Sequence, residues 1–145
     1  MNKAFFFFLV AAALVNASVF QIGPAFGAQD ADTGTVIAYY FHSSTRCPTC
    51  YKLEQYSKEA IEANFKDALD SGKLEFKVVN IEGWGNEHFV QDYQLYTKSL
   101  ILSLVKDGKE LKSKNLTKIW DYVGNKQKFI NYVSEEVNNF LKETQ

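Results

Sequence analysis

Cys47 and Cys50 carry the most reactive side chains of this sequence and are its only cysteines. They are separated by Pro48 and Thr49, and two thiols at this spacing can close a small disulfide or hold a soft metal ion. The pair follows an aromatic and β-branched run at residues 35–41 and begins a long amphipathic segment. A CxxC at a strand-to-helix junction is typical of a redox-active dithiol. The sequence therefore predicts thiol–disulfide exchange as the chemistry of the chain.

The expected helix start at Pro48 gives the two cysteines different environments. Proline suits the first helical position, because its missing N–H would have no partner there. Cys47 then lies at the helix N-cap or just before it, where unpaired backbone N–H groups favour a thiolate. Cys50 lies one turn further in, on the face that carries Leu53, and we expect it to be more buried. These positions predict that Cys47 attacks a partner disulfide and that Cys50 resolves the mixed disulfide.

A soft-metal or arsenite site is the alternative chemistry for the same two sulfurs. Thiolates select soft ions such as Cu(I), and an imidazole can complete such a site. His42 precedes Cys47 by five residues, although a polar residue at a strand end without a binding role is its plainer interpretation. A closed zinc site uses four ligands, and the chain supplies two cysteines and two histidines. A purely structural disulfide is the third alternative. His42, Arg46, Pro48 and Thr49 are candidates for tuning the thiolate or for contacting the partner.

Residues 1–27 have the pattern of a secretory signal peptide. A positive start at Lys3 is followed by unbroken apolar sequence at residues 4–15 and then by small residues. Cleavage is expected after Gly27, with Ala17 as a second candidate and an uncleaved anchor as the alternative. We therefore expect export to the periplasm or another extracytoplasmic compartment, where a dithiol is oxidised unless a dedicated donor reduces it.

The composition limits the expected partners. The chain has 145 residues, a formal net charge of −1 and 46% hydrophobic residues, which fits one globular domain. Acids and lysines are interspersed, so there is no electrostatic case for nucleic acid. We expect no cofactor, and a protein or small-molecule disulfide or thiol as partner. A membrane-bound electron donor is an open alternative, with membrane contact only through an uncleaved signal.

Hydrophobic periodicity divides residues 35–145 into alternating strands and helices, after a linker at 28–34. The expected strands cover 35–41, 74–81, 99–105 and about 110–114, the last two joined by a tight Asp-Gly turn. The expected helices run from 48 to about 69, from a cap at Asn86 to about 94, from 116 to 123, and onward from a cap at Asn125.

With the CPTC motif, this β-α-β-α-β-β-α order resembles the thioredoxin superfamily. The resemblance implies an α/β, three-layer fold in which helices flank a central sheet of about four strands. More closely, the chain is similar to small exported thioredoxin-like proteins labelled nitrophenyl compound nitroreductase subunit, ArsF type. Matching stretches are residues 40–42, 46–50, 96–100 and 120–132. No flavin or nicotinamide site is evident, so nitroreduction by this chain alone is not predicted.

One departure from the superfamily concerns the loop expected to face the cysteines. That loop usually carries a cis-proline before the third strand, but the only prolines here are Pro24 and Pro48. The equivalent stretch is 98–101, where we expect trans bonds because a cis bond without proline costs about 3 kcal/mol. Ser99 and Leu100 are expected to form the facing loop.

Two further departures lie before the first cysteine. Arg46 replaces the usual tryptophan, and Phe41 replaces the usual buried acid of the preceding strand. We expect the exchange chemistry to be kept and the partner to be unusual. Among the tryptophans, Trp84 is expected to pack over the end of the sheet, with an exposed docking edge for an accessory subunit as the alternative. Trp120 is expected to seat the C-terminal elements on the core.

Overall fold

The computed structural model describes residues 34–144, so the expected signal peptide and nearly all of the linker lie outside the described residues. The chain forms a mixed four-stranded sheet in the order β2-β1-β3-β4. Its strands are β1 (Thr35–His42), β2 (Leu74–Asn80), β3 (Ser99–Lys106) and β4 (Lys109–Asn115). Strand β1 pairs in parallel with β2 and antiparallel with β3, and β3 pairs antiparallel with β4.

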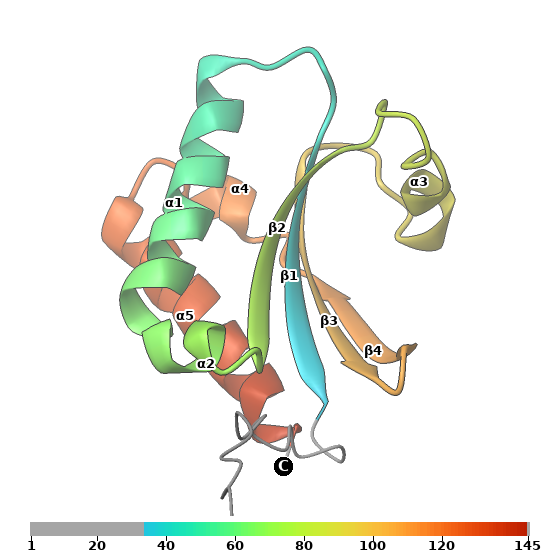
Figure 1. The fold of residues 1–145 in the computed structure, drawn as a ribbon. Helices are drawn as coiled ribbons and strands as arrows, with labels where there is room; N and C mark the ends of the chain where they lie inside the picture. Colours follow the sequence, from blue (N-terminus) through green and yellow to red (C-terminus); the bar gives the residue numbers. More distant parts are fainter. Residues whose placement is uncertain (1–33, 145) are drawn as a thin grey trace, which may run out of the picture.

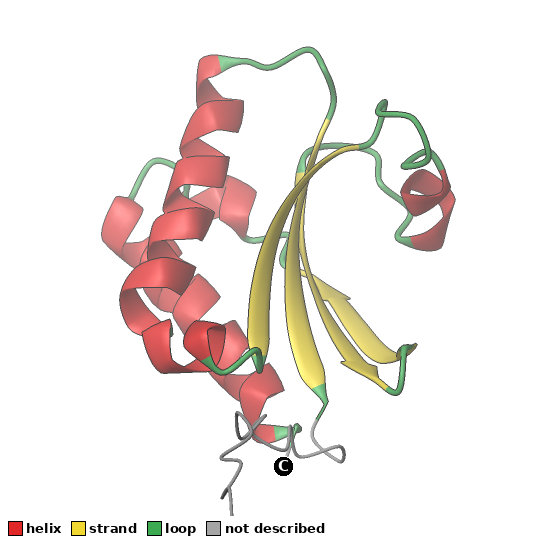
Figure 2. Cartoon of the chain, viewed as in Figure 1, coloured by secondary structure: helices red, strands yellow, loops and turns green. Residues whose placement is uncertain are grey.

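Helices lie on both faces of this sheet (Figures 1 and 2). The helices are α1 (Pro48–Asn64), α2 (Lys66–Asp70), α3 (His88–Asp92), α4 (Ile119–Tyr122) and α5 (Lys126–Lys142). One face carries α1, α2, α4 and α5, and the other carries α3. This arrangement confirms the predicted three-layer α/β fold, in which helices flank a central four-stranded sheet. Within residues 34–144, no helix is long and apolar enough to span a bilayer.

Side chains of β1 point alternately to the two faces of the sheet and contribute to the hydrophobic core on each face. Val36, Ala38 and Tyr40 face the larger helical layer and are fully buried, while Phe41 faces α3. Successive strand side chains point to opposite faces, so a central strand must be apolar on both. On the α3 side, the Phe41 ring lies 5.1 Å from that of Phe89, centroid to centroid. The end of β1 is therefore held from both sides, just before the chain turns toward the cysteines.

The two long helices bury matching apolar stripes against each other and the sheet. Leu53 and Ile61 of α1 are fully buried, as are Phe129 and Val133 of α5. Burying each such side chain contributes about 1.5–3 kcal/mol. The predicted C-terminal helix is confirmed, and so is its cap, because Asn125 Oδ1 accepts from the N–H of Lys128 at 3.0 Å.

Two local expectations were wrong. The helix expected to continue to residue 69 breaks at Phe65, whose backbone (φ −132°, ψ 34°) leaves helical geometry while its side chain is buried. Asn86 does not cap the short helix, because its side-chain amide donates to the carbonyl of Asn80 at 2.9 Å. Helix α3 instead has Glu87 as N-cap, without a side-chain hydrogen bond.

Candidate functional site

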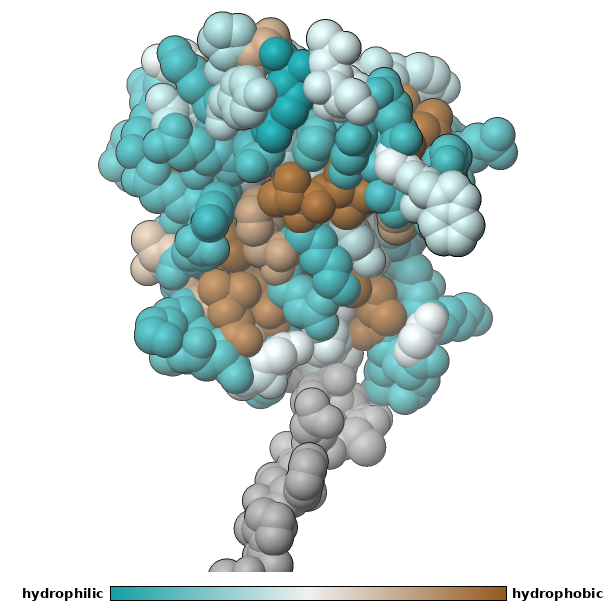
Figure 3. Space-filling view, turned by 45° about the horizontal axis from the view of Figure 1, so that its top comes forward, coloured by the Kyte–Doolittle hydropathy of each residue, from teal (hydrophilic) through white to brown (hydrophobic). Residues whose placement is uncertain are grey.

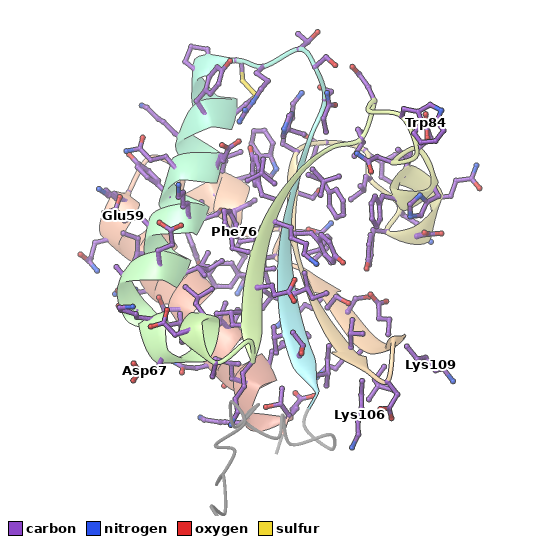
Figure 4. All side chains as sticks on the ribbon, viewed as in Figure 1. Glu59, Asp67, Phe76, Trp84, Lys106 and Lys109 are labelled. Atoms are coloured by element: carbon purple, nitrogen blue, oxygen red, sulfur yellow. A yellow bond between two sulfur atoms is a disulfide. The ribbon has the colours of Figure 1, made fainter. Side chains whose placement is uncertain are left out.

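The two cysteines lie at the N-terminus of α1, which follows β1 after a short loop. Cys47 is the N-cap residue with an extended backbone (φ −99°, ψ 165°), and Pro48 is the first helical residue, as predicted. The sulfurs of Cys47 and Cys50 are joined as a disulfide with a Cα–Cα distance of 5.1 Å. Figure 4 shows this disulfide at the end of α1.

The two cysteines differ in solvent exposure. Cys47 is exposed, whereas Cys50 is only 2% exposed, as expected from its place one turn into the helix. The Sγ of Cys47 accepts a hydrogen bond from the backbone N–H of Cys50 at 3.2 Å. This is the position in which an N-cap side chain satisfies a free helical N–H.

Arg46 turns toward the body of the helix. Its guanidinium forms an ion pair with Glu54, and the two side chains are 16% and 26% exposed. The guanidinium carbon also lies 4.3 Å from the centroid of the Tyr51 ring. The positive charge predicted next to Cys47 is therefore present, but a carboxylate compensates it. Sequence reasoning missed Glu54, although its place four residues after Cys50, on the same helix face, was a usable signal.

Tyr40 connects the central strand to the active-site turn. Its hydroxyl donates to the backbone carbonyl of Cys50 at 2.7 Å, and the residue is fully buried. Burial raises the pKa of Tyr40 to about 12, against the opposing charge of Arg46. The hydroxyl is therefore a donor throughout the ordinary pH range. This bond is not predictable from the sequence, because it depends on how β1 packs against α1.

The remaining tuning candidates occupy the rim of the site. His42 is half-buried at the end of β1, with Nδ1 2.9 Å from the carbonyl oxygen of Ser43. Because a carbonyl only accepts, Nδ1 carries the proton in this contact. The His42 ring centroid is 6.4 Å from that of Tyr40. Pro48 is exposed and Thr49 is half-buried in the first turn of α1. None of these placements tests a tuning role, which stays a prediction.

Ser99 and Leu100 are the first residues of β3 rather than an exposed loop. They pair with Phe41 and Tyr40, and both are buried. Ser99 Oγ donates to the carbonyl of Thr97 at 3.0 Å. No described peptide bond is cis, as expected for this stretch without proline.

Before Ser99, the carbonyl of Lys98 accepts from the indole N–H of Trp120 at 3.0 Å. Trp120 is 36% exposed, so it links α4 to the start of β3 while remaining partly at the surface.

A small hollow lies at the end of the sheet where β1 and β2 finish and β3 begins. Its lining combines polar and apolar side chains: His42, Ser43, Ile81, Leu95, Tyr96, Thr97 and Lys98. The loop from His42 to Cys47 leaves from the same strand end, so this hollow and the disulfide belong to one end of the molecule.

The expectation that Trp84 packs over the sheet is wrong. Trp84 is 98% exposed, in the loop between β2 and α3 (Figure 4). The glycines on either side bring no side chains to cover it. Tyr96, on the hollow, is 92% exposed. Figure 3 shows hydrophobic residues on the face it displays as separate patches among hydrophilic ones, not as one continuous surface.

A metal site would have to be built largely from the two sulfurs. Within residues 34–144, no group of three or more His, Cys, Asp or Glu side chains gathers in a way that could hold a metal ion. His88, which is exposed on α3, pairs with Asp92 of its own helix at 3.9 Å. Among the described residues, a soft ion would therefore be bound by Cys47 and Cys50 without a third His, Cys, Asp or Glu ligand.

Comparison with solved structures finds chains that resemble this one. A thioredoxin of Fasciola hepatica is similar, with 23% sequence identity over 64% of this chain and 82% of that chain and a TM-score of 0.37. No protein-family model matches the sequence. No curated protein matches it either. The resemblance to the ArsF-type proteins therefore stays a prediction.

Proposed function

We propose that this chain is an exported thiol–disulfide oxidoreductase in which Cys47 is the nucleophile and Cys50 the resolving cysteine. The observation that carries the proposal is the difference in access between an exposed Cys47 and a Cys50 that is 2% exposed. A partner's sulfur can reach only the first of these. The topology supports it as well, because the pair lies at the start of the helix that follows the central strand.

The exchange proceeds in two displacement steps when the chain acts as reductant. The Cys47 thiolate attacks one sulfur of a partner disulfide, forms a mixed disulfide and releases a partner thiolate, which takes up a proton. The Cys50 thiolate then attacks Cys47 Sγ, closes the Cys47–Cys50 disulfide and releases the second partner thiol. Two electrons pass to the partner. Oxidation of a partner dithiol is the same sequence reversed.

Trapping in the native cell tests the proposal. Cys50→Ser removes the resolving sulfur, so mixed disulfides through Cys47 should accumulate and be identified after non-reducing electrophoresis. Cys47→Ser is the matched control, since its remaining sulfur is buried and should trap little. Equal trapping by both variants, or none by either, would contradict the assigned roles.

Export is part of the same proposal and is supported by the signal-like pattern of residues 1–27. Its test is the N-terminal sequence of the mature protein in a fractionated cell. A start at Ala28 is expected, and recovery of the uncleaved chain in the cytoplasm would contradict export.

A docking subunit is the second candidate function, favoured by the 98% exposure of Trp84. In that case the chain binds another protein through its surface, and its two cysteines take no part in the function. Replacing both cysteines with serine separates the two candidates, because a docking subunit keeps its cellular function without them. Trp84→Ser should then abolish the function that the double cysteine variant retains.

A further inference from the structure

The side chain of Arg46 lies along the first turn of α1, on the face that carries the cysteines. Cys50 and Glu54 are four residues apart, so they share one face of the helix one turn from each other. Arg46 precedes Cys47, and its guanidinium pairs with Glu54. The side chain therefore spans the turn that contains the disulfide.

The guanidinium of Arg46 is largely enclosed there. Its side chain is 16% exposed and its Nε is buried without a hydrogen-bond partner among the described residues. Charges in such a position are screened less than charges at the surface. A positive charge here consequently favours a thiolate in the adjacent turn.

Glu54 determines how much of that charge acts on the sulfurs. An ionised carboxylate in contact with the guanidinium cancels most of its field at neighbouring atoms. The other titratable groups facing Arg46 in the described chain are Tyr40 from β1 and Tyr51 from α1. Tyr40 stays neutral because burial raises its pKa to about 12, and the His42 ring lies 6.4 Å from that of Tyr40.

We infer, on the basis of the exchange function proposed above, that Arg46 and Glu54 are positioning residues that together set the acidity of the Cys47 thiol. Arg46 favours the thiolate. Glu54 holds Arg46 beside the helix and limits its effect on the sulfurs. Because a more acidic thiol stabilises the reduced form, the pair also sets how strongly oxidising the disulfide is.

The test is the pH dependence of Cys47 alkylation by iodoacetamide in a Cys50→Ser background. Glu54→Gln should move the midpoint to lower pH by about one unit, a tenfold change in acid dissociation. Arg46→Met should move it to higher pH. With both cysteines present, a tenfold change in the exchange equilibrium caused by Glu54→Gln raises the reduction potential by about 30 mV against glutathione.

Two further variants control for structural effects. Glu62→Gln removes a carboxylate of the same helix that pairs with Lys58 at 3.8 Å, and should leave the midpoint unchanged. Glu54→Asp keeps the charge and should stay near the parent value even if Glu54→Gln folds poorly by circular dichroism. An unchanged midpoint in folded Glu54→Gln, or shifts of the same sign in the Arg46 and Glu54 variants, would overturn the inference.

Alkylation needs no biological partner. If trapping finds none, the proposed function fails while the acidity measurement still decides the role of Arg46 and Glu54.

Discussion

The hydroxyl of Tyr40 donates a hydrogen bond to the backbone carbonyl of Cys50 at 2.7 Å, which ties the central strand to the first turn of the helix that carries both cysteines. Both residues are almost completely buried, at 0% and 2% exposure. The hydrogen bond from Tyr40 to Cys50 therefore holds in place the helical turn that follows the exposed Cys47.

We expect Tyr40→Phe to lower the free energy of unfolding by about 1 kcal/mol, because it leaves the ring in place and removes one buried hydrogen bond. Urea denaturation followed by circular dichroism measures this loss. Tyr56→Phe is the matched control, since Tyr56 lies on α1 and packs through its ring, 5.6 Å from that of Phe129. An equal loss in both variants would mean that the bond to Cys50 contributes nothing specific.

The turn between β3 and β4 depends on positive backbone φ angles at Asp107 (53°) and Gly108 (72°). We expect Gly108→Ala to cost about 1–2 kcal/mol, because an L-residue other than glycine is strained in the left-handed region. Gly124→Ala is the control. No atom lies within 4 Å of a Cβ built at either glycine, and only Gly108 has a positive φ. Equal urea midpoints for the two variants would contradict this explanation.

Trp84 is 98% exposed, so Trp84→Ser should change the free energy of unfolding by no more than about 0.5 kcal/mol. If the side chain contacts a protein partner, the variant exchanges more slowly with that partner but is reduced by dithiothreitol at the parent rate. Leu111→Ser on β4, a 57% exposed site, is the control and should affect neither rate. Slower reduction by dithiothreitol in Trp84→Ser would indicate instead that the site itself is disturbed.

The parts of the fold that were predictable from sequence are those fixed by short-range chemistry. The cysteine spacing after a buried strand, Pro48 at the first helical position and Asn125 as a cap each depend on neighbours within a turn. The β3–β4 hairpin is of the same kind, because its turn is specified by an Asp-Gly pair.

The features that could not be predicted from the sequence depend on contacts between residues that are distant in the sequence. Arg46 pairs with Glu54, eight residues away, and its guanidinium lies against the Tyr51 ring. The helix breaks at Phe65, whose side chain is buried, and a helical pattern alone does not reveal such a break. Because tryptophan is highly buried on average, burial of Trp84 is the natural expectation, but the glycines on either side of Trp84 give its ring no packing surface.

Glu110, on β4, joins the edge of the sheet to the α3 region. Its carboxylate accepts from the hydroxyls of Tyr93 and Ser103, each at 2.5 Å. Burial raises the pKa of Glu110, but hydrogen bonds from Ser103, Tyr93 and Ser113 outweigh burial and hold the pKa below its ordinary value of 4.5.

A carboxyl whose pKa is lower in the folded state stabilises the fold above its unfolded pKa, and this contribution is lost as the pH falls through the folded value. Glu110→Gln should therefore destabilise the domain at pH 7 and flatten the decline of stability below about pH 4.5. Urea denaturation at a series of pH values from 7 to about 2 measures both effects. Glu62→Gln, whose parent residue forms an exposed pair with Lys58, should keep the parent pH dependence. If Glu110→Gln shows the same acid decline as the parent chain, the hydrogen bonds from Tyr93 and Ser103 do not favour the ionised carboxylate.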